Sequence, residues 1–195
     1  MRIHVIGLGN VLMGDDGFGP SVIERFASER EVLGDVSLTD AGTPGLDLLP
    51  FILDADALLI VDTVQARGRP GELRIYQKAC LLEARVPSRM GPHDPALSHA
   101  LQTRELAGPP LIAATLIGVI PARVAVGPGL SHPVRSRIPD VLDILACDLS
   151  RLGCETRRRA PERIDPPWWE APIANYSPTL AGPSAPDTRM SPPMP

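Results

Sequence analysis

The chain has 195 residues, a hydrophobic fraction of 44% and a formal net charge of −4 at pH 7. That length fits one ordinary domain with a buried core, and the negative charge argues against a nucleic acid as the main partner. Its apolar runs are far shorter than the roughly 18 to 20 residues of a membrane span. Its three cysteines form no CxxC pair. We therefore expect a cytoplasmic protein with no membrane partner.

Apolar runs alternate with helical patterns along most of the chain. The first run, Ile3 to Gly7, predicts a buried strand that is followed by a glycine-rich loop. Pro20 suits the first turn of the next helix. Further apolar runs predict strands at residues 36–40, 57–64, 71–76 and 110–120. Helices are expected at residues 20–30, 46–53, 95–106 and 133–152. This order predicts an α/β fold, a three-layer sandwich with a mostly parallel, twisted sheet of about five strands and helices on both faces.

The composition changes after the last predicted helix. Ten prolines lie between Pro161 and Pro195, together with Ala, Ser and Gly. Such a segment buries too little apolar surface to offset the entropy lost on ordering. We therefore predict one α/β domain over residues 1–153 and a Pro-rich, disordered tail over residues 154–195.

The loop after the first strand, GLGNVLMGDDGFG at residues 7–19, carries two adjacent carboxylates, Asp15 and Asp16. A strand, a glycine-rich loop and a helix can hold a phosphate on backbone N–H groups, but two carboxylates at that place would repel it. One of them could instead cap the helix, or both could face a cation. The spacing leaves these three interpretations open.

Asp62 ends the most apolar of the predicted strands. A carboxylate there is costly unless it is paired, hydrogen-bonded or bound to a metal. Ligands of open α/β sheets gather beyond the carboxyl ends of the strands, so Asp62 and Asp16 can reach the same crevice. A structural hydrogen bond from Asp62 to nearby backbone is the alternative.

His93 lies in a loop between Pro92 and Pro95, which leaves its backbone little freedom. A lone loop histidine is more often simply exposed. Together with two carboxylates, however, one imidazole suits a divalent ion such as Ni²⁺, Zn²⁺ or Fe²⁺. The sequence contains no GxSxG or HExxH motif and no cysteine in a recognisable nucleophile context.

Five segments, in order, resemble the hydrogenase maturation endopeptidases, which process the large subunit of NiFe hydrogenases. The resemblance spans about residues 2–152. It rests on GLGNVLMGDDGFG (7–19), DAGTPGLDLL (40–49), LIVDT (59–63), SRMGPHD (88–94) and LIGVIP (116–121).

The resemblance implies that Asp16, Asp62 and His93 bind nickel. Some members of the family carry glutamate where Asp16 stands, and Asp15 is a neighbour that could partly substitute for it. Asp40 matches a further family acid near the cleft. No separate catalytic residue is assigned, because either the metal or one of the carboxylates could assist the attack of water.

The implied reaction is metal-recognising, aspartyl-type hydrolysis of one peptide bond, which removes a C-terminal peptide from the large-subunit precursor. Nickel would arrive with that precursor, and the Pro-rich tail of the protease would be dispensable. Two rival functions remain at this point. A non-cleaving nickel-sensing chaperone would bind the same precursor, and a nucleotide-binding protein would use the glycine-rich loop.

Overall fold

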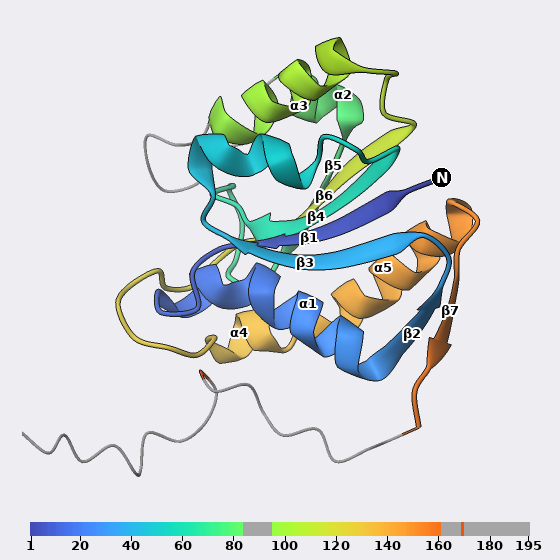
Figure 1. The fold of residues 1–195 in the computed structure, drawn as a ribbon. Helices are drawn as coiled ribbons and strands as arrows, with labels where there is room; N and C mark the ends of the chain where they lie inside the picture. Colours follow the sequence, from blue (N-terminus) through green and yellow to red (C-terminus); the bar gives the residue numbers. More distant parts are fainter. Residues whose placement is uncertain (84–94, 161–168, 170–195) are drawn as a thin grey trace, which may run out of the picture.

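The structure, a computed structural model, describes residues 1–83, 95–160 and 169. At its centre is a twisted five-stranded sheet with the strand order β3-β1-β4-β6-β5 (Figure 1). Four strands run parallel and β5 pairs antiparallel with β6, which confirms the predicted, mostly parallel sheet. The strands are β1 (Ile3–Leu8), β3 (Val36–Gly42), β4 (Ala57–Thr63), β5 (Leu73–Gln77) and β6 (Ala113–Val119).

Helices cover both faces of the sheet, as predicted. On one face, α1 (Phe18–Glu29) and α5 (Ile138–Arg151) enclose a core with alternate residues of the central strands. On the other, the 3-10 helix η2 (Gly45–Phe51), α2 (Lys78–Leu82) and α3 (Pro95–Ala107) enclose a second core. Every residue of β4 is buried, because a parallel central strand is covered on both sides.

Three details differ from the expected elements. The helix predicted around Pro50 is the 3-10 helix η2, with a kink at Asp47, and proline explains why no regular α-helix forms there. The long last helix is divided into α4 (His132–Arg135) and α5. The elements that the apolar pattern did not reveal are β2 (Arg30–Leu33), α2, β7 (Glu155–Arg158) and the short 3-10 helix η1 (Gly14–Gly17).

The folded domain continues beyond the predicted boundary at residue 153. Strand β7 pairs antiparallel with β2, and the N–H of Arg159 donates to the carbonyl oxygen of Glu29 at 2.8 Å. Cys154 is 7% exposed and packs into the core that α1 and α5 form. Residues 154–159 therefore belong to the domain. The predicted disorder of the later residues falls outside the described part of the chain, apart from Trp169.

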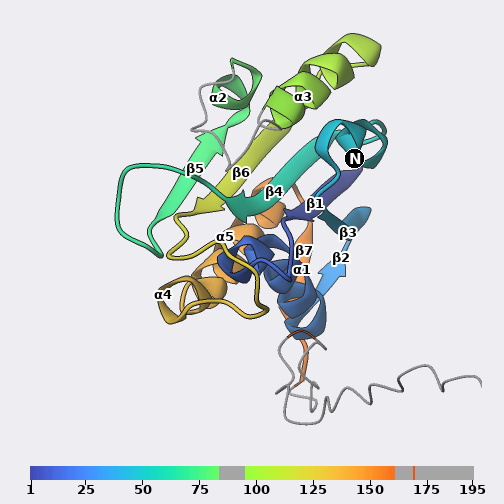
Figure 2. The same cartoon turned by 90° about the vertical axis from the view of Figure 1, so that its left-hand side faces the viewer.

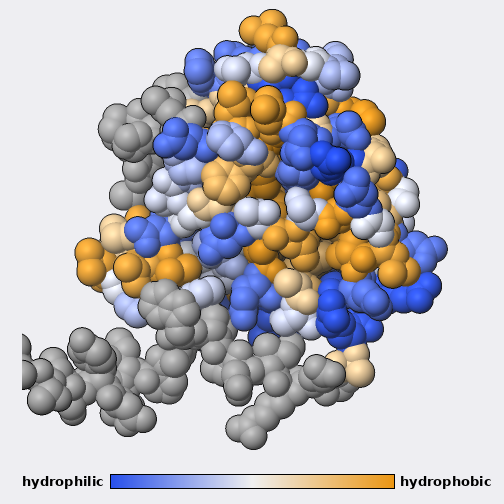
Figure 3. Space-filling view, viewed as in Figure 1, coloured by the Kyte–Doolittle hydropathy of each residue, from blue (hydrophilic) through white to orange (hydrophobic). Residues whose placement is uncertain are grey.

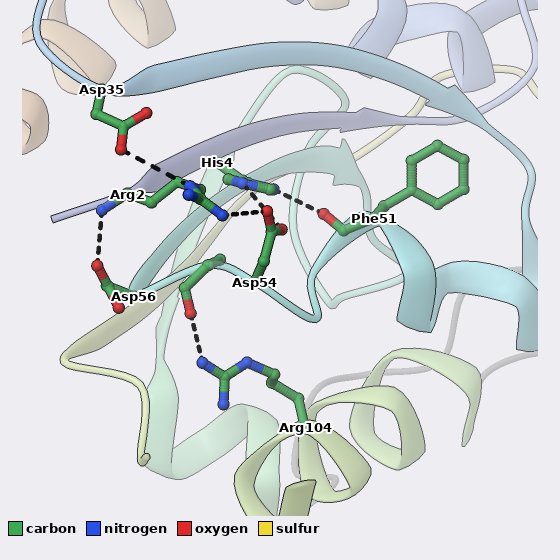
Figure 4. A network of polar contacts seen from close by, with 8 residues as sticks. Arg2, His4, Asp35, Phe51, Asp54, Asp56 and Arg104 are labelled. Carbon is green, nitrogen blue, oxygen red and sulfur yellow. Dashed lines mark hydrogen bonds and ion pairs between the residues drawn. The ribbon is translucent and has the colours of Figure 1, made fainter. Parts of the chain in front are cut away.

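A polar network ties the amino ends of the strands together (Figure 4). Arg2 forms ion pairs with Asp54 and Asp35, and its backbone N–H donates to Asp56. The guanidinium of Arg2 holds the pKa of the Asp54 carboxyl below its usual value. Nearby, buried Arg104 donates to the carbonyl oxygen of Ala55 at 2.6 Å. The amino ends of the strands are thus fixed by structural contacts, and the predicted site lies at their carboxyl ends.

Candidate active site

The glycines of the first loop allow helix α1 to touch the sheet. A Cβ on Gly19 would lie 2.3 Å from the carbonyl oxygen of Leu8 and 2.6 Å from that of Val61. A Cβ on Gly7 would lie 2.5 Å from the carbonyl oxygen of Gly19. The first turn of α1 is therefore pressed directly against β1 and β4. Close packing accounts for these glycines without a bound phosphate.

Asp15 is a buried structural carboxylate. It is 1% exposed and accepts hydrogen bonds from the backbone N–H groups of Ala122 (2.8 Å), Arg123 (2.9 Å) and Ser131 (2.6 Å), and from the Ser131 hydroxyl (2.9 Å). Helix α1 begins after Gly17, and no side chain in the described part of the chain caps it. Asp15 thus does not cap the helix, and its carboxylate binds the loop after β6 rather than the partners of Asp16. It holds the loop that follows β6.

Asp16 turns toward the end of β4. The backbone N–H of Asn10 donates to its Oδ2 at 2.9 Å, and the hydroxyl of Thr63 donates to its Oδ1 at 3.2 Å. The side chain is half-buried. These contacts fix the carboxylate at the carboxyl edge of the sheet, where the sequence places it.

Asp62 contacts the same threonine. It is 1% exposed at the end of β4, and its Oδ1 accepts from the backbone N–H of Thr63 at 2.6 Å. The structural hydrogen bond weighed as an alternative is therefore present. Because Asp16 also contacts Thr63, the two carboxylates of the predicted site meet at one residue. Carboxylate oxygens at this end of the sheet are the type of ligand that a divalent cation accepts.

The third predicted ligand, His93, lies outside the described residues. Within residues 1–83 and 95–160, no group of three or more His, Cys, Asp or Glu side chains could hold a metal ion. Asp40 lies at the carboxyl end of β3, is exposed, and accepts from the N–H of Gly42 at 2.9 Å. Its expected place near the cleft and its role stay predictions.

Exposed apolar side chains border the site. Leu12 is 49% exposed and Val126 is 84% exposed. Their loops are joined by a bridge between Met13 and Gly127. Apolar atoms gather at the left-hand edge of the molecule in Figure 3, the edge to which these loops extend in Figure 1. Such a rim suits contact with another protein.

Sequence reasoning missed two residues that organise this region. Thr63 touches both carboxylates, and its only sequence signal is its position after Asp62 at the end of a buried run. Ser131 donates to Asp15 across 116 positions of the chain. No local sequence pattern can predict such a partner, because only the fold brings the two loops together.

Comparison with known proteins identifies a family and several relatives. The family model of hydrogenase maturation proteases matches residues 20–147. The chain is 32% identical over 160 residues to the hydrogenase expression/formation protein HupD of Rhodobacter capsulatus, covering 82% of this chain and 76% of that protein. It is also 32% identical over 157 residues to the hydrogenase 2 maturation protease of Escherichia coli, covering 80% and 94%.

A solved structure shares the fold. The hydrogenase-maturating endopeptidase HybD of E. coli superimposes with a TM-score of 0.74 and 28% identity, over 82% of this chain and 98% of that one. The fold and these relatives together define a peptidase. The chain belongs to the hydrogenase maturation protease family.

Proposed function

We propose that this protein removes a C-terminal peptide from the nickel-loaded precursor of a NiFe hydrogenase large subunit by hydrolysing one peptide bond. The observation that carries this proposal is the meeting of Asp16 and Asp62 at Thr63, at the carboxyl edge of a maturation-protease fold. The apolar rim beside it, with Leu12 and Val126, favours a protein substrate. A cytoplasmic location stays a prediction from the sequence.

In this proposal nickel is part of the substrate. Asp16 and Asp62 supply carboxylate oxygens, and His93 supplies an imidazole nitrogen, as the family resemblance implies. Oxygen and nitrogen donors together suit a borderline divalent ion. A precursor that carries nickel can then bind with its scissile bond in register, and a precursor without nickel lacks this anchor. Cleavage therefore waits for metal insertion.

Hydrolysis needs a polarised carbonyl group and a water molecule that loses a proton. The ion can polarise the carbonyl oxygen, and the carboxylate of Asp16 or Asp62 can accept the proton of the attacking water. Both roles require the carboxylates of Asp16 and Asp62 at fixed positions. The hydrogen bonds from Asn10 and Thr63 meet that requirement, because they orient the carboxylates before the substrate arrives.

The test is incubation of the purified protein with its large-subunit precursor, with and without inserted nickel, followed by intact mass. We expect loss of a short C-terminal peptide from the nickel-loaded precursor alone. Asp16→Asn, Asp62→Asn and His93→Ala should abolish this loss, while His99→Ala, at an exposed position of α3, should retain it. Equal cleavage of the nickel-free precursor would overturn the role of the metal.

The non-cleaving chaperone is not favoured, because the relatives include maturation proteases. It predicts stable binding of the precursor without loss of mass. The nucleotide-binding alternative loses its basis at the glycine-rich loop. Gly7 and Gly19 of that loop allow close packing of α1 on the sheet. Asp15 puts a buried carboxylate in the loop, where a nucleotide phosphate would have to bind.

A further inference from the structure

A pocket of about 480 Å³ opens beside the candidate active site. One wall is the start of the β4–β5 loop, and Gln65 in this wall follows Asp62 by only three positions. The other wall is the segment after β6. Both segments leave the carboxyl ends of neighbouring parallel strands (Figure 2). The pocket that they line therefore lies at the same end of the sheet as Asp16 and Asp62. The lining residues are Gln65, Ala66, Arg67 and residues 120–124.

The two walls are fixed in place. Asp15 binds the backbone N–H groups of Ala122 and Arg123, and Asp15 directly precedes Asp16. The wall after β6 is thus connected to the loop that carries a site carboxylate. On the other side, Arg74 donates to the carbonyl oxygen of Arg67 at 2.9 Å. A preformed pocket of this size can hold a ligand without a large ordering cost.

The charge of the pocket is opposite to that of the protein. The chain carries a net charge of −4, yet the charged side chains that line the pocket are the guanidinium groups of Arg67 and Arg123. Both residues are exposed, and neither forms an ion pair within the described parts of the chain. The nearby carboxylate of Glu72 is paired with Arg74 and Arg69. Two guanidinium groups in a pocket suit a carboxylate ligand, which arginine binds with two parallel hydrogen bonds.

We propose that this pocket binds a carboxylate of the precursor's C-terminal extension, with Arg67 and Arg123 as the residues that determine its recognition. The inference rests on the proposed function, since it assigns the pocket to the peptide that the protease releases. The carboxylate can be the terminal one or that of an acidic side chain in the extension. Its capture at this end of the sheet would add affinity for the extension while nickel anchors the other part of the precursor.

The first experiment measures kcat and KM for processing of the nickel-loaded precursor. The double variant Arg67→Gln/Arg123→Gln should raise KM about tenfold or more, with kcat little changed. A rise of this size is expected when a charge-assisted contact with the substrate is removed. The matched control is Arg151→Gln, at an exposed position at the end of α5, which should leave kcat and KM unchanged. Unfolding midpoints should agree among all variants, because the three side chains are exposed. An unchanged KM in the double variant, with normal cleavage by the wild type, would overturn this inference and leave the proposed function intact.

The second experiment uses synthetic peptides that copy the extension as competitors, and calorimetry to measure their direct binding. Weaker binding of the C-terminally amidated peptide would identify the terminal carboxylate. Weaker binding of a peptide with Asn and Gln in place of its acidic residues would identify a side chain. Equal binding of all three peptides would overturn the carboxylate assignment. If the wild type does not cleave the precursor, the proposed function fails, and binding that depends on the two arginines still supports the pocket.

Discussion

Asp15 and Arg123 are joined by a reciprocal pair of hydrogen bonds. The N–H of Arg123 donates to Asp15 Oδ2 at 2.9 Å, and its carbonyl oxygen accepts from the N–H of Asp15 at 3.0 Å. This pair connects the loop after β1 with the loop after β6, although 108 positions separate the two residues. Asp15 therefore determines the relative position of the site carboxylate Asp16 and the pocket wall.

The two adjacent carboxylates should respond differently to the same substitution. Asp15→Asn removes the charge that four donors share and turns an amide NH₂ toward some of them, so we expect a loss of about 2–4 kcal/mol in the free energy of unfolding. Asp16→Asn should cost about 1 kcal/mol, because that side chain is half-buried and its hydrogen bonds from Asn10 and Thr63 can partly persist with an amide oxygen, yet it should abolish processing. Urea denaturation and the mass assay measure the two effects. Equal destabilisation at both positions would contradict this division.

Gly9 is required for close approach as well as for its backbone conformation. Its φ is +134°, and an added Cβ would lie 1.8 Å from the carbonyl oxygen of Asp16. Gly42 also has a positive φ, +59°, but an added Cβ there would meet no atom of the described chain within 4 Å. We expect Gly42→Ala to cost about 1–2 kcal/mol and Gly9→Ala about 3 kcal/mol or more, measured by denaturant unfolding. Similar costs at the two sites would show that conformation alone matters.

Glu72 should contribute stability that disappears in acid. Hydrogen bonds from Arg74 and Arg69 lower its pKa from 4.5 to about 2. Because the folded pKa lies below the unfolded one, the contribution is fully present above pH 4.5 and is lost as the pH falls toward 2. The stability difference between the wild type and Glu72→Gln should therefore be constant above about pH 5 and shrink between these limits. A difference that does not change down to pH 2 would contradict the assigned pKa.

Two truncations test where the domain ends. A chain that ends after Ala160 keeps β7 and should retain its unfolding midpoint and its processing activity. A chain that ends after Gly153 loses buried Cys154 and the partner strand of β2, which should lower the free energy of unfolding by about 2 kcal/mol or more. Scanning calorimetry compares the two. Loss of activity in the longer truncation would show that the remaining tail takes part in the reaction.

Much of the architecture was predictable because local patterns specify it. A short run of apolar residues such as 57–61 indicates a strand covered on both faces. The amphipathic pattern of residues 138–151 likewise predicts that α5 has one apolar side. The antiparallel β2–β7 ribbon was not predictable. Its sequences, REVL and ETRR, are short and largely polar, and each becomes a strand only because the other lies beside it.

The sequence by itself determined the fold class and the family. The order of strands and loops brings Asp16 and Asp62 to the carboxyl edge of the sheet, and the segment resemblance points to a maturation protease. The tertiary structure decided which of two adjacent aspartates faces Thr63 and which is buried against Ser131. It also placed Arg67 and Arg123 around one pocket. The physical reason is that side-chain partners across long loops are chosen by packing and by hydrogen-bond geometry, which local residue patterns do not encode.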